Sequence, residues 1–203
     1  MMLTNPFGRP TSIARFLIRA IVALVVLTAA WSQVARFSSA PAAWGAQFVL
    51  EQWSRGWVRA VHRENSALEV ETRVPVPQAN SSGMVAELVT DANATRYAYG
   101  LPLYLALLLA AGGGRWLRNA TLGYAILLLP QIFSTVMVVL RNIVAVGGSA
   151  RVLVVDSWQI EAIALGYQLG SLLLPTIVPI AIWLMLDRGF LVAMMPRVRK
   201  PPL

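Results

Sequence analysis

The stretch RYAYGLPLYLALLLA, residues 96–110, is where the chain changes from polar to apolar. Arg96 closes a segment that is rich in charged and polar residues, and an uninterrupted apolar run begins a few positions later. Tyr97 and Tyr99 stand at the change, and aromatic side chains with one polar end favour a membrane–water interface. The pattern therefore predicts that an aqueous segment ends here and that a membrane helix begins.

Both ends of this predicted helix are marked by residue type. Gly100 ends the incoming extended chain, and Pro102 lies in the first helical turn, where its missing N–H costs nothing. Three consecutive glycines at 112–114 stop the helix, and Trp116 anchors it at the other membrane face. We expect this span to cover residues 97–114.

The composition is typical of a membrane protein. Hydrophobic residues make up 57% of the chain and charged residues 13%, against about 45–50% and about 25% in soluble domains. Three further windows, residues 20–35, 119–140 and 162–186, are apolar and free of Asp, Glu, Lys and Arg. Since roughly 20 apolar residues cross a bilayer, we expect a mainly α membrane protein with four transmembrane helices.

The distribution of charge indicates how these helices are oriented. Basic residues concentrate before the first span, between the second and third, and after the fourth: Arg9, Arg15, Arg19, Arg115, Arg118, Arg188, Arg197, Arg199 and Lys200. Cytoplasmic flanks carry such an excess, so both termini are predicted to be cytoplasmic. The net charge of +8 is then a membrane signature, and it forms no basic patch of the kind that binds nucleic acid.

This orientation predicts an order of segments along a multi-pass membrane protein. The order is a cytoplasmic tail with the first helix (1–36), an extracytoplasmic segment (37–96), the second helix (97–114), a cytoplasmic turn (115–118), the third helix (119–140), an extracytoplasmic loop (141–161), the fourth helix (162–186) and a basic cytoplasmic tail (187–203). Two alternatives stay open. The first span has the basic and apolar regions of a cleavable signal peptide, and the apolar loop 142–158 is compatible with a re-entrant course.

The first half of the extracytoplasmic segment has a helical pattern over residues 41–64. Its apolar side chains recur at intervals of three and four, which places them on one helical face: Leu50, Trp53, Trp57 and Val61. Together with Trp44, the tryptophans predict an amphipathic helix that lies in the membrane interface and contacts lipid or a partner. The alternative is a helix that packs on a small soluble domain.

The second half alternates between apolar and polar residues, as a half-buried strand does. Leu68, Val70 and Val74 fall on one face, and Glu69 and Arg73 fall on the other. A turn-rich stretch at 77–83 and a second apolar run at 84–90 complete a predicted β-hairpin. An isolated hairpin is marginally stable, so we expect it to pack on the amphipathic helix or on a partner.

Few residues in this chain are suited to catalysis. The absence of cysteine excludes a thiol nucleophile and thiolate metal sites. The single histidine, His62, has no cysteine or second histidine with which to hold a metal. We predict no catalytic, cofactor or metal site, and we retain as an alternative a membrane hydrolase in which His62 acts with Glu64 or Asp91.

Polar and small residues inside the predicted spans indicate helix packing. Gly166 and Gly170 form a G-x-x-x-G pair, which permits close approach of helices, and Gln131 and Gln168 are suited to hydrogen bonding between helices. Transporters usually place ionisable groups at depth, and the predicted spans contain none. We therefore favour packing over a substrate path.

The layout resembles the exosortase H-associated membrane proteins of Gram-negative bacteria. The resemblance covers most of the chain and rests mainly on YGLPL at 99–103, followed by Ala106 and Leu107. It implies a non-enzymatic accessory to an exosortase, a multi-span membrane enzyme that processes proteins with short C-terminal sorting tails by cysteine chemistry. The alternative from a different class is a structural component of a polysaccharide or pilus assembly machine.

Overall fold

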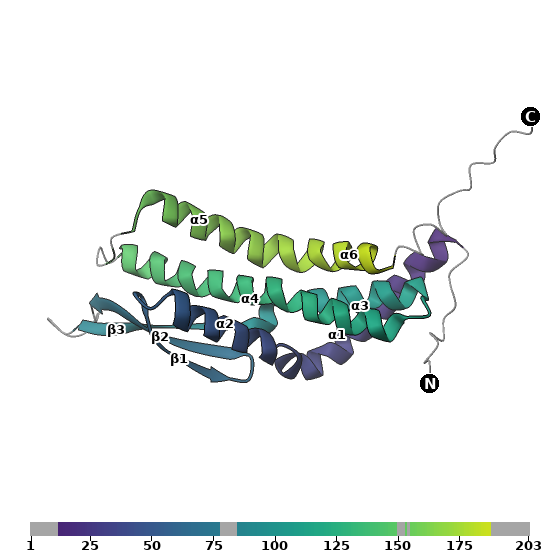
Figure 1. Cartoon of the computed structure of the whole chain (residues 1–203), viewed down its shortest axis with the longest axis horizontal. Helices are drawn as coiled ribbons and strands as arrows, with labels where there is room; N and C mark the ends of the chain where they lie inside the picture. The colour runs from purple at the N-terminus through teal and green to yellow at the C-terminus, as the bar shows by residue number, and fades with distance from the viewer. Residues whose placement is uncertain (1–11, 78–84, 150–152, 154, 188–203) are drawn as a thin grey trace, which may run out of the picture.

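The computed structural model describes residues 12–77, 85–149, 153 and 155–187, which are mainly helical. Their order is α1 (Ile13–Ser38), α2 (Ala40–Trp53), β1 (Val58–Glu64), β2 (Ala67–Pro77), β3 (Val85–Asn93), the 3-10 turn η1 (Ala94–Tyr97), α3 (Gly100–Ala111), α4 (Trp116–Ser149), α5 (Ser157–Gln168), the π-helical segment η2 (Leu169–Leu173) and α6 (Leu174–Leu186). The molecule is elongated, with the sheet at one end and the start of α1 and the end of α6 at the other (Figure 1).

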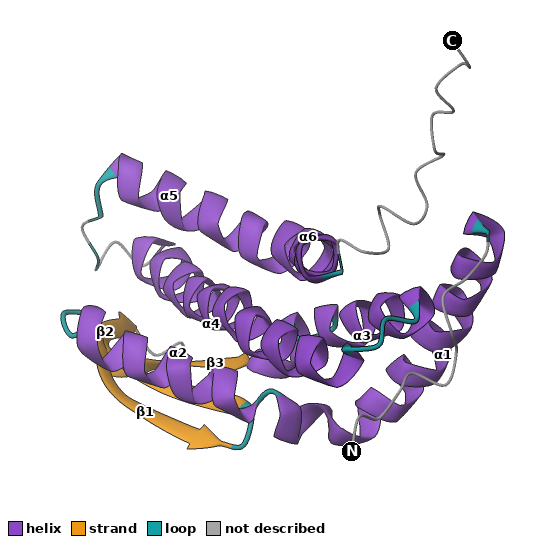
Figure 2. Ribbon diagram, turned by 45° about the vertical axis from the view of Figure 1, so that its right-hand side comes forward, coloured by secondary structure: helices purple, strands orange, loops and turns teal. Residues whose placement is uncertain are grey.

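Helix α4 is the centre of the fold. It has 34 residues, so it is about 51 Å long at 1.5 Å per residue, well beyond the roughly 30 Å of a bilayer core. It contacts α2, α3, α5, α6 and the strands β2 and β3 (Figure 2). One helix therefore joins the two ends of the molecule.

Two apolar cores lie along α4. The core near the sheet joins α2, the sheet and the second half of α4, and it contains Leu50, Val61, Val70, Val139 and Ile143. The core at the opposite end joins α1, α3, α4 and α6, and it contains Phe16, Tyr104, Leu108, Leu127 and Trp183. Stacking of the Phe16 and Trp183 rings, with centroids 5.5 Å apart, fixes the start of α1 against the end of α6.

The sheet is antiparallel, with strand order β1-β2-β3. Leu68, Val70 and Val74 of β2 are buried, while Glu69 and Arg73 are exposed. The alternation predicted for β2 is confirmed, and the predicted return strand is β3. The sheet packs its apolar face on α2 and α4.

The structure corrects the helix predicted over residues 41–64. Helix α2 ends at Trp53, and Val58–Glu64 forms β1. A register shift between Val58 and Ala60 places both Val58 and Val61 on the buried side of β1, because a bulge adds one residue to a strand. Their spacing of three is therefore the same as that of a helical repeat. In place of the predicted helix and hairpin, this segment forms a shorter helix and a three-stranded sheet.

Within the part of the chain that the structure describes, three helical runs are long and apolar enough to cross a membrane: Ile13–Trp53, Trp116–Gly148 and Ser157–Leu186. The predicted span at 97–114 is a shorter helix, because η1 precedes it and Gly112, with φ of 68°, ends it in the left-handed conformation. At twelve residues, α3 rises about 18 Å. The structure thus supports three of the four predicted spans by length and composition.

The two later spans are longer than predicted. Residues 141–149 belong to α4 and residues 157–161 to α5, although we expected both in a loop. The part of the predicted re-entrant stretch that the structure describes is thus largely helical. Residues 78–83 of the predicted turn lie outside the described residues, as do residues 1–11 and 188–203 of the predicted tails.

Candidate apolar cleft and aromatic surface

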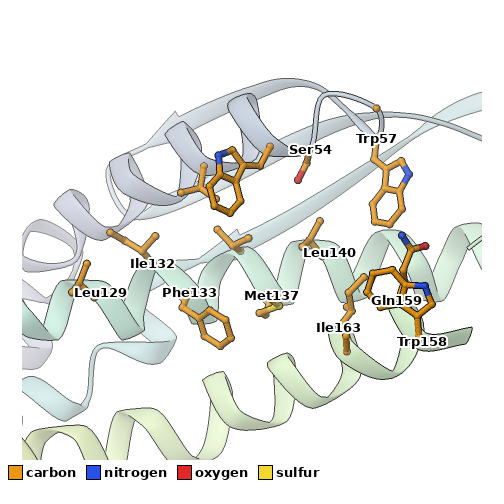
Figure 3. A pocket seen from close by; sticks show the side chains of 15 residues that line it. Ser54, Trp57, Leu129, Ile132, Phe133, Met137, Leu140, Trp158, Gln159 and Ile163 are labelled. Carbon is orange, nitrogen blue, oxygen red and sulfur yellow. The ribbon is translucent and has the colours of Figure 1, made fainter. Parts of the chain in front are cut away.

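A cleft of about 640 Å³ lies between α2, α4 and α5 (Figure 3). Its floor is α4, which contributes Phe133 and Met137, and α5 forms the opposite wall with Trp158 and Ile163. The third side is the end of α2 and the turn into β1, including Trp57. Most of this lining is apolar, so the cleft is suited to apolar groups rather than to a polar substrate.

The two ends of the cleft differ in polarity. Ser54, the indole of Trp57 and the amide of Gln159 lie at one end, whereas Leu129 and Ile132 lie at the other (Figure 3). The polar end adjoins the start of α5, and the apolar end lies midway along α4. A bound molecule would therefore meet hydrogen-bonding groups at one end only.

The structure separates the three tryptophans that we predicted on one interface. Trp53 and Trp57 line the cleft. The ring of Trp44 instead lies under the Arg63 guanidinium beside the sheet, with its centroid 5.0 Å from Cζ of Arg63. Trp44 is 62% exposed and Trp53 86% exposed, and Trp57 is half-buried. Two indoles of α2 are thus available to lipid or to a partner on different sides of the helix.

The residues at the start of α3 make a tight contact with α6. A Cβ on Gly100 would lie 2.6 Å from the carbonyl oxygen of Pro175, so no larger residue fits there without a shift. Pro102 is buried, Tyr97 is half-buried and Tyr99 is exposed. Gly100 therefore serves packing as well as the start of the helix.

The G-x-x-x-G pair lies where α4 meets the run from α5 to α6. A Cβ on Gly166 would lie 2.7 Å from the sulfur of Met137, and one on Gly170 would lie 3.0 Å from Cα of Ser134. The Ser134 hydroxyl donates to the Gly170 carbonyl at 2.6 Å. We had not singled out Ser134 as the partner of this pair.

The two predicted glutamines do not meet. Gln168 is exposed, whereas Gln131 is 3% exposed and its Oε1 has no hydrogen-bond partner among the described residues. The described residues show no hydrogen bond between these two side chains. The contact between α4 and this run depends instead on the two glycines and Ser134.

His62 lies on the exposed face of the sheet, away from the cleft. Its Nε2 is 3.2 Å from Oε1 of Glu71, and the two side chains are 64% and 40% exposed. Glu64 and Asp91 line the same shallow depression, but Glu71 is the charged partner of His62. Within the described ranges, no three His, Asp or Glu side chains are grouped so that they would hold a metal ion.

The cleft wall on α5 was not predicted. Trp158 falls in the predicted loop and Ile163 in the predicted fourth span, and no local pattern marks them as part of a cleft. They face α2 only because α4 holds both helices. This part of the site depends on contacts between segments far apart in the chain.

These features define a helical membrane protein with a small sheet and an apolar cleft. The exosortase H-associated membrane protein family matches residues 10–190 of the sequence. The chain belongs to this family, as the resemblance over residues 99–107 predicted. Neither the curated proteins nor the solved structures provide a match.

Proposed function

We propose that this protein is a non-enzymatic accessory subunit in the bacterial inner membrane that assists an exosortase in protein sorting. The observation that carries the proposal is the family match over residues 10–190, because the family is described as exosortase H-associated. A multi-span membrane enzyme is then the partner. The cysteine on which exosortase chemistry depends is supplied by that enzyme, since this chain has none.

The proposed arrangement puts the sheet on the extracytoplasmic side and both termini in the cytoplasm. The start of α1 and the end of α6 lie together, away from the sheet (Figure 1). Arg115, between α3 and α4, and Arg118, in the first turn of α4, belong to the same basic set as the flanks of α1 and α6. Basic residues favour the cytoplasmic side, which supports this orientation.

The proposed contact with the partner is made by the exposed tryptophans of α2. Tryptophan is over-represented among the residues that dominate binding energy at protein interfaces. Trp44 and Trp53 expose most of their indoles, and α2, which carries them, is held by buried contacts with the sheet and α4. A rigid support of this kind limits the entropy lost when a partner binds.

Co-purification from cells in mild detergent tests the proposal. We expect the tagged full chain to retain an exosortase, and Trp44→Ala with Trp53→Ala to release it without loss of the tagged protein. Phe37→Ala, which also removes an exposed aromatic ring, is the control. A glycosyltransferase or a pilus subunit in place of the exosortase would contradict the proposal and favour the assembly-machine alternative.

A further inference from the structure

We propose that the cleft between α2, α4 and α5 binds one acyl chain of a membrane phospholipid. The chain enters between Gly56 and Ala162 and extends along α4 toward Leu129, and the headgroup stays beside Trp57 and Gln159. This proposal does not rest on the proposed role in sorting, although Trp53 lines the cleft and is also a proposed partner contact.

The cleft lies at the depth of one membrane leaflet. The run from Ala162 to Leu186 contains no charged residue and is about 36 Å long at 1.5 Å per residue, enough to cross a core of roughly 30 Å. Ala162 lines the polar end of the cleft, and the first charge beyond it is Glu161. On α4, Leu140 lines the cleft and Arg141 follows it.

The length of the cleft agrees with this depth. Leu129 and Leu140 both line it, and an α-helix rises about 16 Å between them. A single leaflet contributes about half of the roughly 30 Å hydrocarbon core. Since Leu129 is 67% exposed, the inner end of the cleft is continuous with the lipid-facing surface of α4.

The size of the cleft favours a single acyl chain over a partner helix. A helix about 10–12 Å across occupies roughly 500 Å³ per turn. The cleft, at about 640 Å³, would hold little more than one turn. Small-molecule sites occupy about 300–1,000 Å³, and an extended hydrocarbon chain fits this range.

The polarity of the cleft fixes the direction of the bound chain. Phe133, Ile132 and Leu129 surround its deep part and offer only apolar atoms. The hydroxyl of Ser54 and the amide of Gln159 lie at the entrance (Figure 3). The Gln159 Oε1 accepts from the Asp156 backbone N–H at 3.2 Å, so the Ser54 hydroxyl and the Gln159 N–H groups can hydrogen-bond to the glycerol esters or the headgroup. A phospholipid has the same division between one polar end and an apolar chain.

Two small residues keep the entrance open. A Cβ added to Gly56 would meet no atom within 4 Å, and Gly56 lies in the turn after α2. Ala162 faces the cleft from α5 and is exposed. Larger side chains at either position would fill the space of the acyl chain without displacing the core.

Photolabelling tests the site in the full chain. The probe is phosphatidylethanolamine with a diazirine at the end of one acyl chain, mixed into phosphatidylethanolamine–phosphatidylglycerol vesicles that contain the protein. We expect adducts on Phe133 and Ile132. Ala162→Phe and Gly56→Leu should each reduce these adducts about tenfold, which corresponds to roughly 1.4 kcal/mol of binding free energy.

Matched controls separate cleft binding from general lipid contact. Ala164→Phe is the control for Ala162→Phe, because Ala164 is exposed on the same helix and does not line the cleft. Gly148→Leu is the control for Gly56→Leu, because a Cβ at Gly148 also meets nothing within 4 Å. Both should label like the unmodified chain. Adducts on the exposed Val25 of α1 should be equal in all variants and report correct insertion.

Equal labelling of Phe133 in the variants that fill the cleft (Ala162→Phe and Gly56→Leu) and in the controls would overturn the proposal, because lipid would then reach this face without entering the cleft. Adducts at Trp57 in place of Phe133 would overturn the stated direction. Loss of exosortase from Ala162→Phe with unchanged Phe133 labelling would make the cleft a protein-binding surface and overturn the lipid assignment. If neither the unmodified chain nor its variants co-purify an exosortase, only the sorting role is contradicted.

Discussion

Helices α1 and α4 have similar apolar character but opposite environments. Both belong to runs that are long and apolar enough to cross a membrane, yet 6% of the most apolar stretch of the run with α1 is buried, against 44% for α4. Helix α1 packs chiefly on α3, whereas α4 contacts four helices and two strands. Apolar character thus indicates which segments suit a bilayer, but not which of them form the core.

The residues that distinguish the two helices are small or polar. On α4, Gly123, Ser134 and Thr135 are buried, whereas α1 exposes branched residues such as Val22 and Val25. Small residues permit close approach in membranes, and hydroxyls bond across helices. Within two equally apolar spans, these residue types mark the helix that is packed inside the protein.

The largest effect is expected for Gly123→Leu on α4. A Cβ at this position would already lie 2.2 Å from Cζ of Tyr104, and Tyr104 is fully buried and donates to the Asn119 carbonyl at 2.6 Å. Overpacking of this kind costs about 1–3 kcal/mol or more, and here we expect the upper end. The thermal unfolding midpoint in detergent should fall sharply.

The matched change on α1 is Ala30→Leu, which adds a larger side chain at an exposed position. We expect its unfolding midpoint to stay within the error of the unmodified protein. Equal losses in the two variants would show that α1 packs inside the protein as α4 does, which contradicts the comparison.

The second effect concerns α2, the continuation of α1 that does pack on α4. Trp53→Ala with Trp57→Ala should abolish sorting function while the protein remains inserted, because Trp53 is 86% exposed and Trp57 is half-buried. We expect a stability loss of at most about 2 kcal/mol from the partly buried ring. Sorting, protein level and protease sensitivity should be measured together.

The control pair on the same helix end is Glu51→Ala with Arg55→Ala. The Arg55 Nε donates to the Glu51 backbone carbonyl at 3.1 Å, and both side chains are exposed, so little binding energy depends on them. A greater loss of sorting from this pair at equal protein level would make the end of α2 a polar recognition surface.

The sequence predicted those parts of the fold in which a local pattern has one physical meaning. Alternation in β2 meant one buried face, and Leu68 and Val70 occupy it. In β1, the bulge between Val58 and Ala60 replaced alternation by a spacing that is also helical. The length of α3 depends on η1 and on the contact of Gly100 with Pro175, which no local pattern records.

The candidate site was only partly predictable for the same reason. Trp53 and Trp57 were identified as interface residues because indoles are conspicuous in sequence. Their neighbours across the cleft, Trp158 and Ile163, are brought there by the packing of α5 on α4. The close contact of Gly170 with Ser134 likewise required the structure.

A smaller effect is expected for Ser134→Ala. The Ser134 hydroxyl lies 2.6 Å from the Gly170 carbonyl, in a buried contact between α4 and η2, and also 2.6 Å from the Pro130 carbonyl of its own helix, so its one hydrogen is shared between the two. Interhelical bonds in membrane proteins contribute about 0.6 kcal/mol and at most about 1.7 kcal/mol, so the free energy of unfolding should fall by roughly 1 kcal/mol. A steric-trapping or denaturant titration in detergent can measure this.

Ser32→Ala on α1 is the matched control, since the Ser32 hydroxyl donates only to the Ala29 carbonyl of its own helix at 2.7 Å. It should leave the free energy of unfolding unchanged. If Ser32→Ala costs as much as Ser134→Ala, the loss comes from the helix itself and not from the contact between helices.

The smallest effect is expected for His62→Ala. The contact between His62 and Glu71 is 3.2 Å, and both side chains are substantially exposed, so the pair contributes well below about 1 kcal/mol. Sorting and protein level should both match the unmodified chain. Loss of sorting at normal protein level would support the hydrolase alternative.

The central claim is that this chain assists an exosortase and does not itself process the sorting tail. The most direct measurement compares the processing of a tailed substrate in cells that have the exosortase, with and without this chain, by blotting for the uncut form. We predict that uncut substrate accumulates without the chain, that the His62→Ala form restores processing, and that the Trp53→Ala, Trp57→Ala form does not. Unchanged processing without the chain, or cleavage of the tail by the purified chain alone, would contradict the account.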